Sequence, residues 1–310
     1  MATWSNSPVT RHEGTSAAAL SAVGAAVLWG TTGTAQALGP GGTDPVTVGA
    51  LRILLGAAVL AALAMPALRG PAARPRPGRL PLGVVMLLGG LCVAAYQAFF
   101  FAGVDRAGVA VGTVVALGVA PLATGLLGLL LGERATRRWA LATAAAVVGV
   151  ALLVAGAGSR DRSVDPLGVA AALGAGASYA GYTVAARTLL LRGARGIVVM
   201  AAFFGVGAVL LAPVLLGADL SWLVTVRGAL MVLWLGLVAT GVSYVLFQRG
   251  LGGLPSGTVA TLSLAEPVTA TLLSVLVLRE DLSLLTAVGI GVVLIGLTLT
   301  ARRQSPRLAP

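Results

Sequence analysis

Several residue types are scarce in this sequence. Its 310 residues include no lysine, one cysteine, Cys92, and one histidine, His12. A lone cysteine cannot form a disulfide within the chain, and a single histidine cannot build a zinc site or a histidine-based catalytic group. The phosphate-binding loop GxxxxGK[ST] needs a lysine, so direct use of ATP is not expected. The sequence therefore predicts no cofactor, no metal site and no enzymatic activity.

Charged residues are also few. They make up 10% of the chain, against 57% hydrophobic residues, and the mean hydropathy is +0.97. This is too little polar surface to cover a soluble globule of this length. Apolar runs long enough to cross about 30 Å of hydrocarbon predict an all-α integral membrane protein. We expect ten transmembrane helices, at residues 17–37, 46–66, 82–104, 109–131, 138–157, 167–190, 196–216, 228–248, 256–278 and 284–301.

Arginine alone supplies the positive charge, and the net charge is +11. If the N-terminus is cytoplasmic and ten spans alternate, fifteen of the 21 arginines fall on the cytoplasmic side. This satisfies the positive-inside rule and predicts a multi-pass protein of the cell (plasma or inner) membrane with both termini cytoplasmic. The basic charge thus fits a bilayer, and no nucleic acid partner is expected. Residues 1–16 carry no cleavable signal pattern, so we expect the first helix to be retained.

The second half of the sequence repeats the first. Residues 112–133, GTVVALGVAPLATGLLGLLLGE, return as residues 257–280, GTVATLSLAEPVTATLLSVLVLRE. Because each copy has five spans, an odd number, the second copy must enter the membrane from the opposite side. We expect two inverted five-helix repeats, with a substrate site near the midplane between them. The expected divisions are a cytoplasmic tail at 1–16, a first repeat at 17–157, an external linker at 158–166, a second repeat at 167–301 and a cytoplasmic tail at 302–310.

Several local patterns resemble a known family. Trp29 and Gly30 precede small hydroxyl residues, Arg52 lies in GALRILLGA, and two related spans close as P-x11-E from Pro121 and EP-x12-E from Glu266. Together these patterns are similar to the EamA family within the drug/metabolite transporter superfamily, over residues 17–301. The resemblance implies a secondary transporter, often an exporter of amino acids, amines or other small metabolites. The second closing pattern is one residue longer, so we expect a bulge or a different helix end there.

Two charged residues lie well inside predicted spans, Glu266 near the bilayer centre and Arg52 in the second span. A charge at the bilayer centre costs about 2.5 to 3.5 kcal/mol on insertion scales, so Glu266 should face a cavity. There it would couple transport to protons or bind a cation, or else bridge two helices as a neutral acid. Arg52 would hold an anionic substrate group or pair with Glu266, or else extend to the headgroups. The sequence leaves open whether the two interact.

Pro121 and Pro267 occupy matching places in the two repeats. A proline removes one backbone hydrogen bond, which would free the carbonyls of Leu117 and Ser263 to face protein or water. The matched pair predicts kinked helices that take part in gating. Because proline is common in membrane helices, a purely structural kink is the alternative.

Aromatic and amide side chains recur at matching places in the first, third, sixth and eighth spans. Trp29 corresponds to Tyr179, and Tyr96 to Tyr244. Such groups can line a pocket for a small-molecule substrate, or they can belong to the interfacial belt. The pocket candidates are Trp29, Tyr96, Gln97, Tyr179, Tyr182, Ser243, Tyr244 and Gln248, whereas Phe99, Phe100 and Phe101 are expected to pack or to face lipid.

Glu133 and Glu280 close the two related spans. We expect each to cap its helix end or to form an ion pair, with a gate latch as the alternative. The expected ion-pair partners are Arg137, Arg138 and Arg279.

Two classes of function fit these features. The first is a secondary active transporter that exports a small metabolite by alternating access around a midplane cavity, with the lipid bilayer as its surroundings and protons as the candidate coupling ion. The second is a membrane scaffold, a partner subunit or a membrane enzyme. Clustered Asp, His or Cys residues at membrane depth are lacking, which argues against an enzyme. A scaffold would not need matched prolines and a midplane glutamate, so we favour the transporter.

Overall fold

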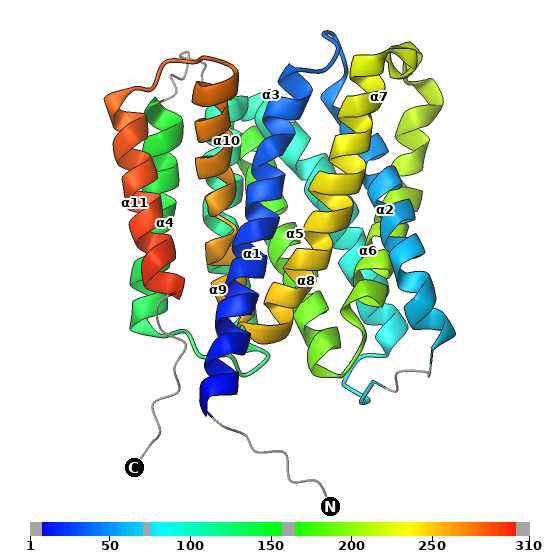
Figure 1. The fold of residues 1–310 in the computed structure, drawn as a ribbon, viewed down its shortest axis with the longest axis vertical. Helices are drawn as coiled ribbons and strands as arrows, with labels where there is room; N and C mark the ends of the chain where they lie inside the picture. Colours follow the sequence, from blue (N-terminus) through cyan, green and yellow to red (C-terminus); the bar gives the residue numbers. More distant parts are fainter. Residues whose placement is uncertain (1–7, 71–74, 157–164, 302–310) are drawn as a thin grey trace, which may run out of the picture.

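The computed structural model describes residues 8–70, 75–156 and 165–301, and this part of the chain is helical, without a strand. The long helices form one bundle (Figure 1). In chain order the helical segments, long and short, are α1 (Pro8–Ala37), α2 (Pro45–Arg69), α3 (Leu82–Leu129), α4 (Arg137–Gly156), α5 (Pro166–Leu191), α6 (Gly196–Leu211), η1 (Ala212–Gly217), η2 (Ser221–Val224), α7 (Val226–Leu233), η3 (Trp234–Val242), α8 (Ser243–Gly253), α9 (Ser256–Leu262), α10 (Ala265–Val277) and α11 (Leu284–Ala301). α1 therefore begins inside the segment expected to be a tail.

α3 doubles back on itself. As a straight helix, its 48 residues would measure about 72 Å, more than twice the thickness of the hydrocarbon core. Gly108 interrupts it with φ 83° and ψ 157°, a conformation that glycine adopts readily. Beyond the break, Gly112 lies against the backbone of Gly103. The second arm of α3 (109–129) therefore turns back toward the end where the first arm (82–107) began, and it contacts the first arm beside the break.

Eight helices of the described chain are long and apolar enough to cross a membrane. α3 counts once among them, and α5 is not included, because its tyrosines and glycines lower its hydropathy. The ten-span count stays a prediction that requires dividing α3 at Gly108 and adding the 26-residue α5. α1 begins and α11 ends at the same end of the bundle (Figure 1), as an even number of crossings demands.

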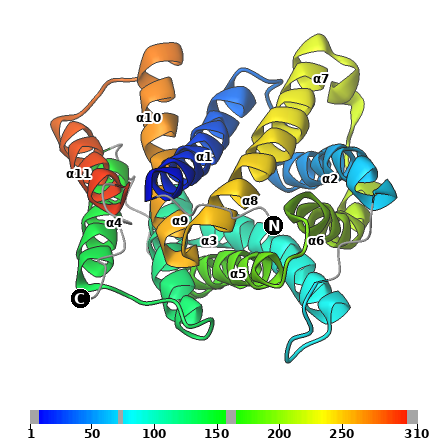
Figure 2. The same cartoon turned by 60° about the horizontal axis from the view of Figure 1, so that its bottom comes forward.

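That same end gathers arginine. The turns 130–136 and 192–195 and the ends of α2 and α8 lie there (Figures 1 and 2). These segments carry Arg69, Arg134, Arg192, Arg195 and Arg249. We call it the arginine-rich end. Its charge agrees with the predicted placement of this end in the cytoplasm, which stays a prediction.

The two halves of the bundle pack in matching pairs. α3 packs most extensively on α5, α4 on α11, α2 on α6, and α1 on α8 and α10. In the duplication α1 corresponds to α5, and α8 corresponds to the first arm of α3. Exchanging the halves therefore converts the α1–α8 contact into the contact between α5 and the first arm of α3, and it leaves the α2–α6 and α4–α11 contacts unchanged. This is the relation that an inverted repeat requires. Small residues allow the close contact, since a Cβ at Gly149 would lie 2.6 Å from the backbone nitrogen of Val293.

Two of the expected spans are irregular. α7, η3 and α8 follow one another without a break, and η3 is a nine-residue π-helix. Inside it the Thr240 hydroxyl donates to the Leu235 carbonyl over 2.8 Å. The expected ninth span is divided into α9 and α10 at residues 263–264. π-helical segments are rare and are frequent at functional sites, so the irregularities direct attention to this part of the bundle.

The second arm of α3 ends in a glycine turn. Gly132 has φ 76°, and the N–H of Glu133 donates to the carbonyl of Gly128 over 3.1 Å. This is a Schellman-type helix ending, in which glycine takes the left-handed position. The turn folds Glu133 back over its own helix.

The matching end of α10 has the same shape with a different residue at the turn. Arg279 takes the left-handed position with φ 62°, and the N–H of Glu280 reaches the carbonyl of Ser274 over 3.2 Å. This bond spans one residue more than its counterpart. The extra residue of the second repeat is thus absorbed in a wider final turn, which confirms the different helix end expected from the sequence.

We expect Arg279→Gly to stabilise the protein. A left-handed conformation costs a non-glycine residue about 1 kcal/mol or more, and part of this gain is offset by the greater freedom of glycine in the unfolded chain. Thermal unfolding in detergent should show a Tm about 1 to 2 °C higher. Arg249→Gly, inside the regular helix α8, is the control and should lower the Tm. A Tm for Arg279→Gly at or below that of the wild type would contradict the assignment of strain.

Candidate functional site

The break between α9 and α10 places a charged side chain at the start of a half-helix. α9 ends at Leu262, and α10 begins at Ala265 with Glu266 in its first turn. The amide dipoles at a helix N-terminus favour a negative charge, and half-helix ends at membrane depth form ion and substrate sites in transporters. The N–H of Glu266 donates to the Ser263 carbonyl over 3.0 Å. The Ser263 carbonyl, which can receive no bond from Pro267, therefore accepts one from its other neighbour and faces protein.

Arg52, on α2, lies in the same region. It acts electrostatically on Glu266 and also on Tyr96 and Tyr244. Neither charged group forms an ion pair or a side-chain hydrogen bond with the described part of the chain. Both side chains are partly buried, and the Nε atom of Arg52 is fully buried without an acceptor. Because neither group bonds to another described side chain, both are available to a ligand.

The five predicted aromatic residues come together in one cluster. The ring centroids lie 5.2 Å apart for Trp29 and Tyr244, 5.1 Å for Tyr179 and Tyr182, and 6.4 Å for Tyr96 and Tyr179. The hydroxyls of Tyr182 and Tyr244 lie 3.3 Å apart. Because the rings come from α1, α3, α5 and α8, the cluster joins the two halves of the chain.

Two hydrogen bonds connect this cluster to the irregular helices. The indole nitrogen of Trp29 donates to the hydroxyl of Ser243, at the end of the π-helix, over 2.9 Å. The hydroxyl of Tyr179 donates to that of Ser263, at the α9–α10 break, over 2.9 Å. Glu266 acts electrostatically on Tyr179 as well as on Tyr96. The cluster therefore borders the break and the charged groups beside it.

The two predicted amides lie in different places. Gln97 is 5% exposed and its Nε2 atom has no acceptor in the described structure. It lies against Gly49, one turn before Arg52 on α2. Gln248 instead lies against Gly196, at the start of α6, outside the aromatic cluster.

The three phenylalanines of the third span behave differently from one another. Phe100 stacks on Tyr96 with centroids 5.7 Å apart, so it extends the cluster instead of facing lipid. Phe99 packs near Gly174 of α5, and Phe101 near Gly49 of α2, as expected for packing residues.

The matched prolines have unequal surroundings. Pro121 is buried inside the second arm of α3, which continues as a helix through it. Pro267 lies in the first turn of α10, directly after the break, where a proline is well tolerated. Only the second of the two expected kinks coincides with an interrupted helix.

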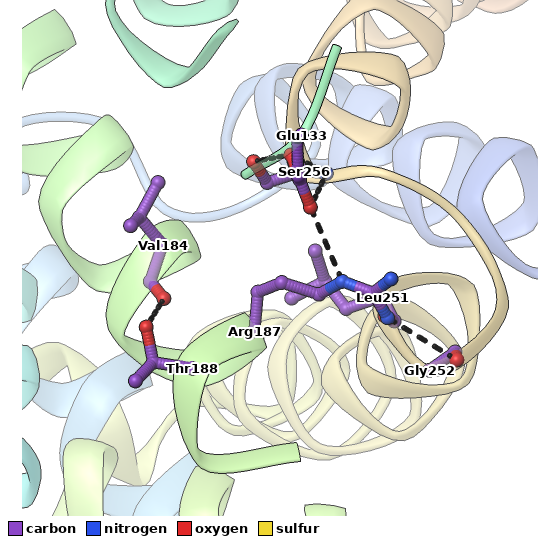
Figure 3. A network of polar contacts seen from close by, with 7 residues as sticks. All are labelled: Glu133, Val184, Arg187, Thr188, Leu251, Gly252 and Ser256. Atoms are coloured by element: carbon purple, nitrogen blue, oxygen red, sulfur yellow. Dashed lines mark hydrogen bonds and ion pairs between the residues drawn. The ribbon is translucent and has the colours of Figure 1, made fainter. Parts of the chain in front are cut away.

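Glu133 makes a different ion pair from the one expected. Its carboxylate accepts a bond from Arg187 Nε over 3.3 Å, and it does not pair with Arg137 or Arg138 in the described chain (Figure 3). The expected partners, Arg137 and Arg138, follow Glu133 closely in the sequence, whereas Arg187 comes from α5 in the other half of the chain. Glu280 accepts a hydrogen bond from Ser274 and has no ion pair with Arg279 within the described residues.

Sequence reasoning missed the side chains of three residues that contribute to these arrangements. Phe204, on α6, packs on Tyr244 with centroids 4.2 Å apart, but its helix is apolar throughout and gives no signal. Ser263 precedes Glu266 by less than one turn, and that spacing could have identified it. Arg187 was counted only as one more arginine on the cytoplasmic side.

Comparisons with known proteins agree with this arrangement. The sequence model of the EamA-like transporter family matches residues 16–155 and again residues 166–302. The uncharacterized transporter YwfM of Bacillus subtilis (strain 168) is 40% identical over 274 residues, which cover 88% of this chain and 90% of that protein. An uncharacterized transporter of Clostridium kluyveri is 28% identical over 135 residues, 43% of each chain. A solved crystal structure with 26% sequence identity superposes with a TM-score of 0.75, covering 91% of this chain and 95% of the other.

The family match occurs twice, once in each half of the internal duplication. The YwfM match spans nearly the whole length of both proteins. With a bundle of long apolar helices, the chain is a multi-pass membrane transporter. It belongs to the EamA-like transporter family, within the drug/metabolite transporter superfamily.

Proposed function

We propose that this transporter is a secondary active carrier that exports small metabolites, such as amino acids or amines, by alternating access. The observation that carries the proposal is the environment of Glu266. It lies at the start of half-helix α10, within the electrostatic range of an equally unpaired Arg52, beside aromatic rings from both halves. Interrupted helices with a charged group at the interface of two repeats are typical of substrate and ion sites in secondary transporters.

Each group has a role in this proposal. Glu266 binds a cationic substrate group or carries the coupling proton. Arg52 holds an anionic group, with Gln97 as a second donor from the neighbouring helix. Trp29, Tyr96, Tyr179, Tyr182 and Tyr244 line the pocket, where rings offer stacking and cation–π contact to a ligand. The arginine-rich end supports a cytoplasmic location for that end in the plasma or inner membrane.

Flux measurements test this function. Metabolites are first compared inside and outside cells that contain or lack the protein, which identifies the candidate substrate and its direction together. Purified protein in proteoliposomes is then supplied with that compound in radiolabelled form under an imposed pH gradient. We expect accumulation that an ionophore abolishes. Absence of flux for a broad panel of amino acids and amines would instead favour a scaffold or partner-subunit role.

We expect the two matched prolines to differ in their effect on transport. Pro267→Ala allows α10 to extend toward α9 across the break, so it should lower the turnover number about tenfold. Pro121→Ala is the matched control, because its helix is already continuous, and it should change turnover less than about twofold. Initial rates in proteoliposomes give both values. Equal effects of the two substitutions would show that the break does not depend on its proline.

A further inference from the structure

A mostly buried polar network joins the two halves of the transporter at the arginine-rich end (Figure 3). The Glu133 carboxylate accepts bonds from the Ser256 N–H over 2.9 Å, from the Ser256 hydroxyl over 2.6 Å and from Arg187. Arg187 also donates to the carbonyls of Leu251 and Gly252. The ion-paired side chains are only 14% and 13% exposed. Four segments, the end of α3, α5, the end of α8 and the start of α9, are thus held together through one carboxylate and one guanidinium.

The end of α3 is shaped for this contact. Its left-handed Gly132 turns Glu133 back over the helix, as described above. Gly128 leaves room for the carboxylate, since a Cβ there would lie 2.6 Å from the Oε2 atom of Glu133 and 2.9 Å from the Ser256 hydroxyl. The carboxylate is therefore accommodated by the helix surface as well as bonded across it.

The corresponding positions at the opposite end cannot form such a network. The repeat alignment that sets Trp29 against Tyr179 places Ala37 against Arg187. The alignment of residues 112 and 257 places Val111 against Ser256. Glu280, the counterpart of Glu133, is exposed and bonds to Ser274 of its own half. The opposite end thus retains the carboxylate and lacks both of its partners.

The opposite end is also open at this place. A cavity of about 540 Å³ lies there between α1, α7 and α10, lined by Ala35, Leu38, Leu230, Leu273 and Val277 among others. In the repeat, the end of α1 corresponds to the end of α5, α7 corresponds to the start of α3, and the end of α10 corresponds to the end of the second arm of α3. At the arginine-rich end, α5 connects to both arms of α3, because Arg187 pairs with Glu133 and Arg192, just after α5, donates to the carbonyl of Leu80, just before α3. One gap is open, and its symmetry mate is closed by charged groups.

We propose that Glu133, Arg187 and Ser256 form a latch that closes the gate at the arginine-rich end and holds the transporter in the state that is open at the opposite end. Alternating access requires two arrangements of the repeats, and a bond made in only one of them shifts the equilibrium toward it. Charge-assisted hydrogen bonds in a partly buried place are strong enough for this. The latch rests on the proposed alternating-access function, but its test needs no substrate.

Distances between spin labels, measured by pulsed EPR in liposomes, report the two gates. The background carries Cys92→Ser, so that only introduced cysteines react. One label pair, at positions 84 and 130, spans the start and the end of α3 at the arginine-rich end. The other pair, at positions 226 and 276, spans α7 and α10 beside the open cavity. All four native side chains are exposed, so labels can be attached without displacing the core.

The distance distributions of the unmodified protein are the reference for both label pairs. Glu133→Gln should raise the population with a longer 84–130 distance and a shorter 226–276 distance by roughly tenfold. Gly128→Ala leaves every charge in place and should act in the same direction, because its methyl group displaces the carboxylate. Arg187→Lys keeps the charge and should have a smaller effect than Arg187→Gln.

Glu280→Gln is the matched control, since it makes the same chemical change at the symmetry-related position, and it should leave both distances unchanged. Circular dichroism and elution as a single species confirm that each variant is folded. The latch is overturned if folded Glu133→Gln and Gly128→Ala both keep the unmodified distance distributions. It is also overturned if the 84–130 distance changes without an opposite change in the 226–276 pair. A reciprocal change in a protein that moves no tested metabolite would instead support the latch and count against the proposed substrates.

Discussion

Replacing Glu266 with glutamine should abolish gradient-driven accumulation of substrate in proteoliposomes. The carboxylate lies in the first turn of α10 and accepts no hydrogen bond from a described side chain, so it can exchange a proton or bind a cation without first breaking a protein contact. Keeping an acidic group at membrane depth costs about 2.5 to 3.5 kcal/mol on insertion scales. The carboxylate is therefore kept for an interaction that glutamine cannot make, and a hydrogen bond to a charged group contributes about 1.5 to 3 kcal/mol, or roughly 10-fold to 100-fold in rate. We expect uphill transport to fall by at least about this factor.

Two assays separate the possible roles of this glutamate. If Glu266 carries the coupling proton, Glu266→Gln keeps downhill exchange of labelled for unlabelled substrate and loses only uphill accumulation. If it binds the substrate, both are lost. Glu280→Gln is the control, since this exposed glutamate at the end of the same span should tolerate the change. Full gradient-driven accumulation by Glu266→Gln would exclude both roles.

The sequence predicts the fold well because the bilayer leaves few alternatives. An apolar run of the right length must become a helix in lipid, since only a helix satisfies its own backbone bonds there. The expected spans accordingly lie within a few residues of the observed helices, with α1 longer at its start. The π-helix of η3 was not predicted. Inside it the Thr240 hydroxyl bonds to the Leu235 carbonyl and the Thr240 side chain packs against Gly56 of α2, and hydropathy does not register either contact.

The candidate site was predictable in its members but only partly in its geometry. The two repeat-matched pairs, Trp29 with Tyr179 and Tyr96 with Tyr244, do meet in one cluster with Tyr182, because symmetry-related positions converge on the repeat interface. The pairing of Glu133 was missed, because a local search finds neighbours such as Arg137 and cannot find Arg187, 54 residues away. Kinks were expected at both prolines, but only the span of Pro267 is interrupted, and the similar sequence around Pro121 stays helical.

Arg52→Gln should weaken transport of substrates that carry a carboxylate. The guanidinium makes no ion pair in the described structure, and its Nε atom is buried without a partner, so a bound anion would satisfy it. A hydrogen bond to a charged group contributes about 1.5 to 3 kcal/mol, which predicts a KM roughly 10-fold to 100-fold higher. An analogue of the same substrate without its carboxylate is the control, and its transport should be affected less than about threefold. Arg52→Lys should retain part of the effect, because lysine keeps the charge but loses the planar fork of donors.

The double variant Arg52→Gln with Glu266→Gln tests whether the two charges act as a pair. A direct ion pair would make the double variant less damaged than either single one, since removing one partner leaves the other uncompensated. The structure has no such pair in its described residues, although each group lies within the electrostatic range of the other. We therefore expect the losses in kcat/KM from the two substitutions to multiply, as they do for groups that contact different parts of a ligand. A double variant more active than Glu266→Gln would show instead that the two side chains pair during the transport cycle, and that the unpaired arrangement is the one prepared for substrate.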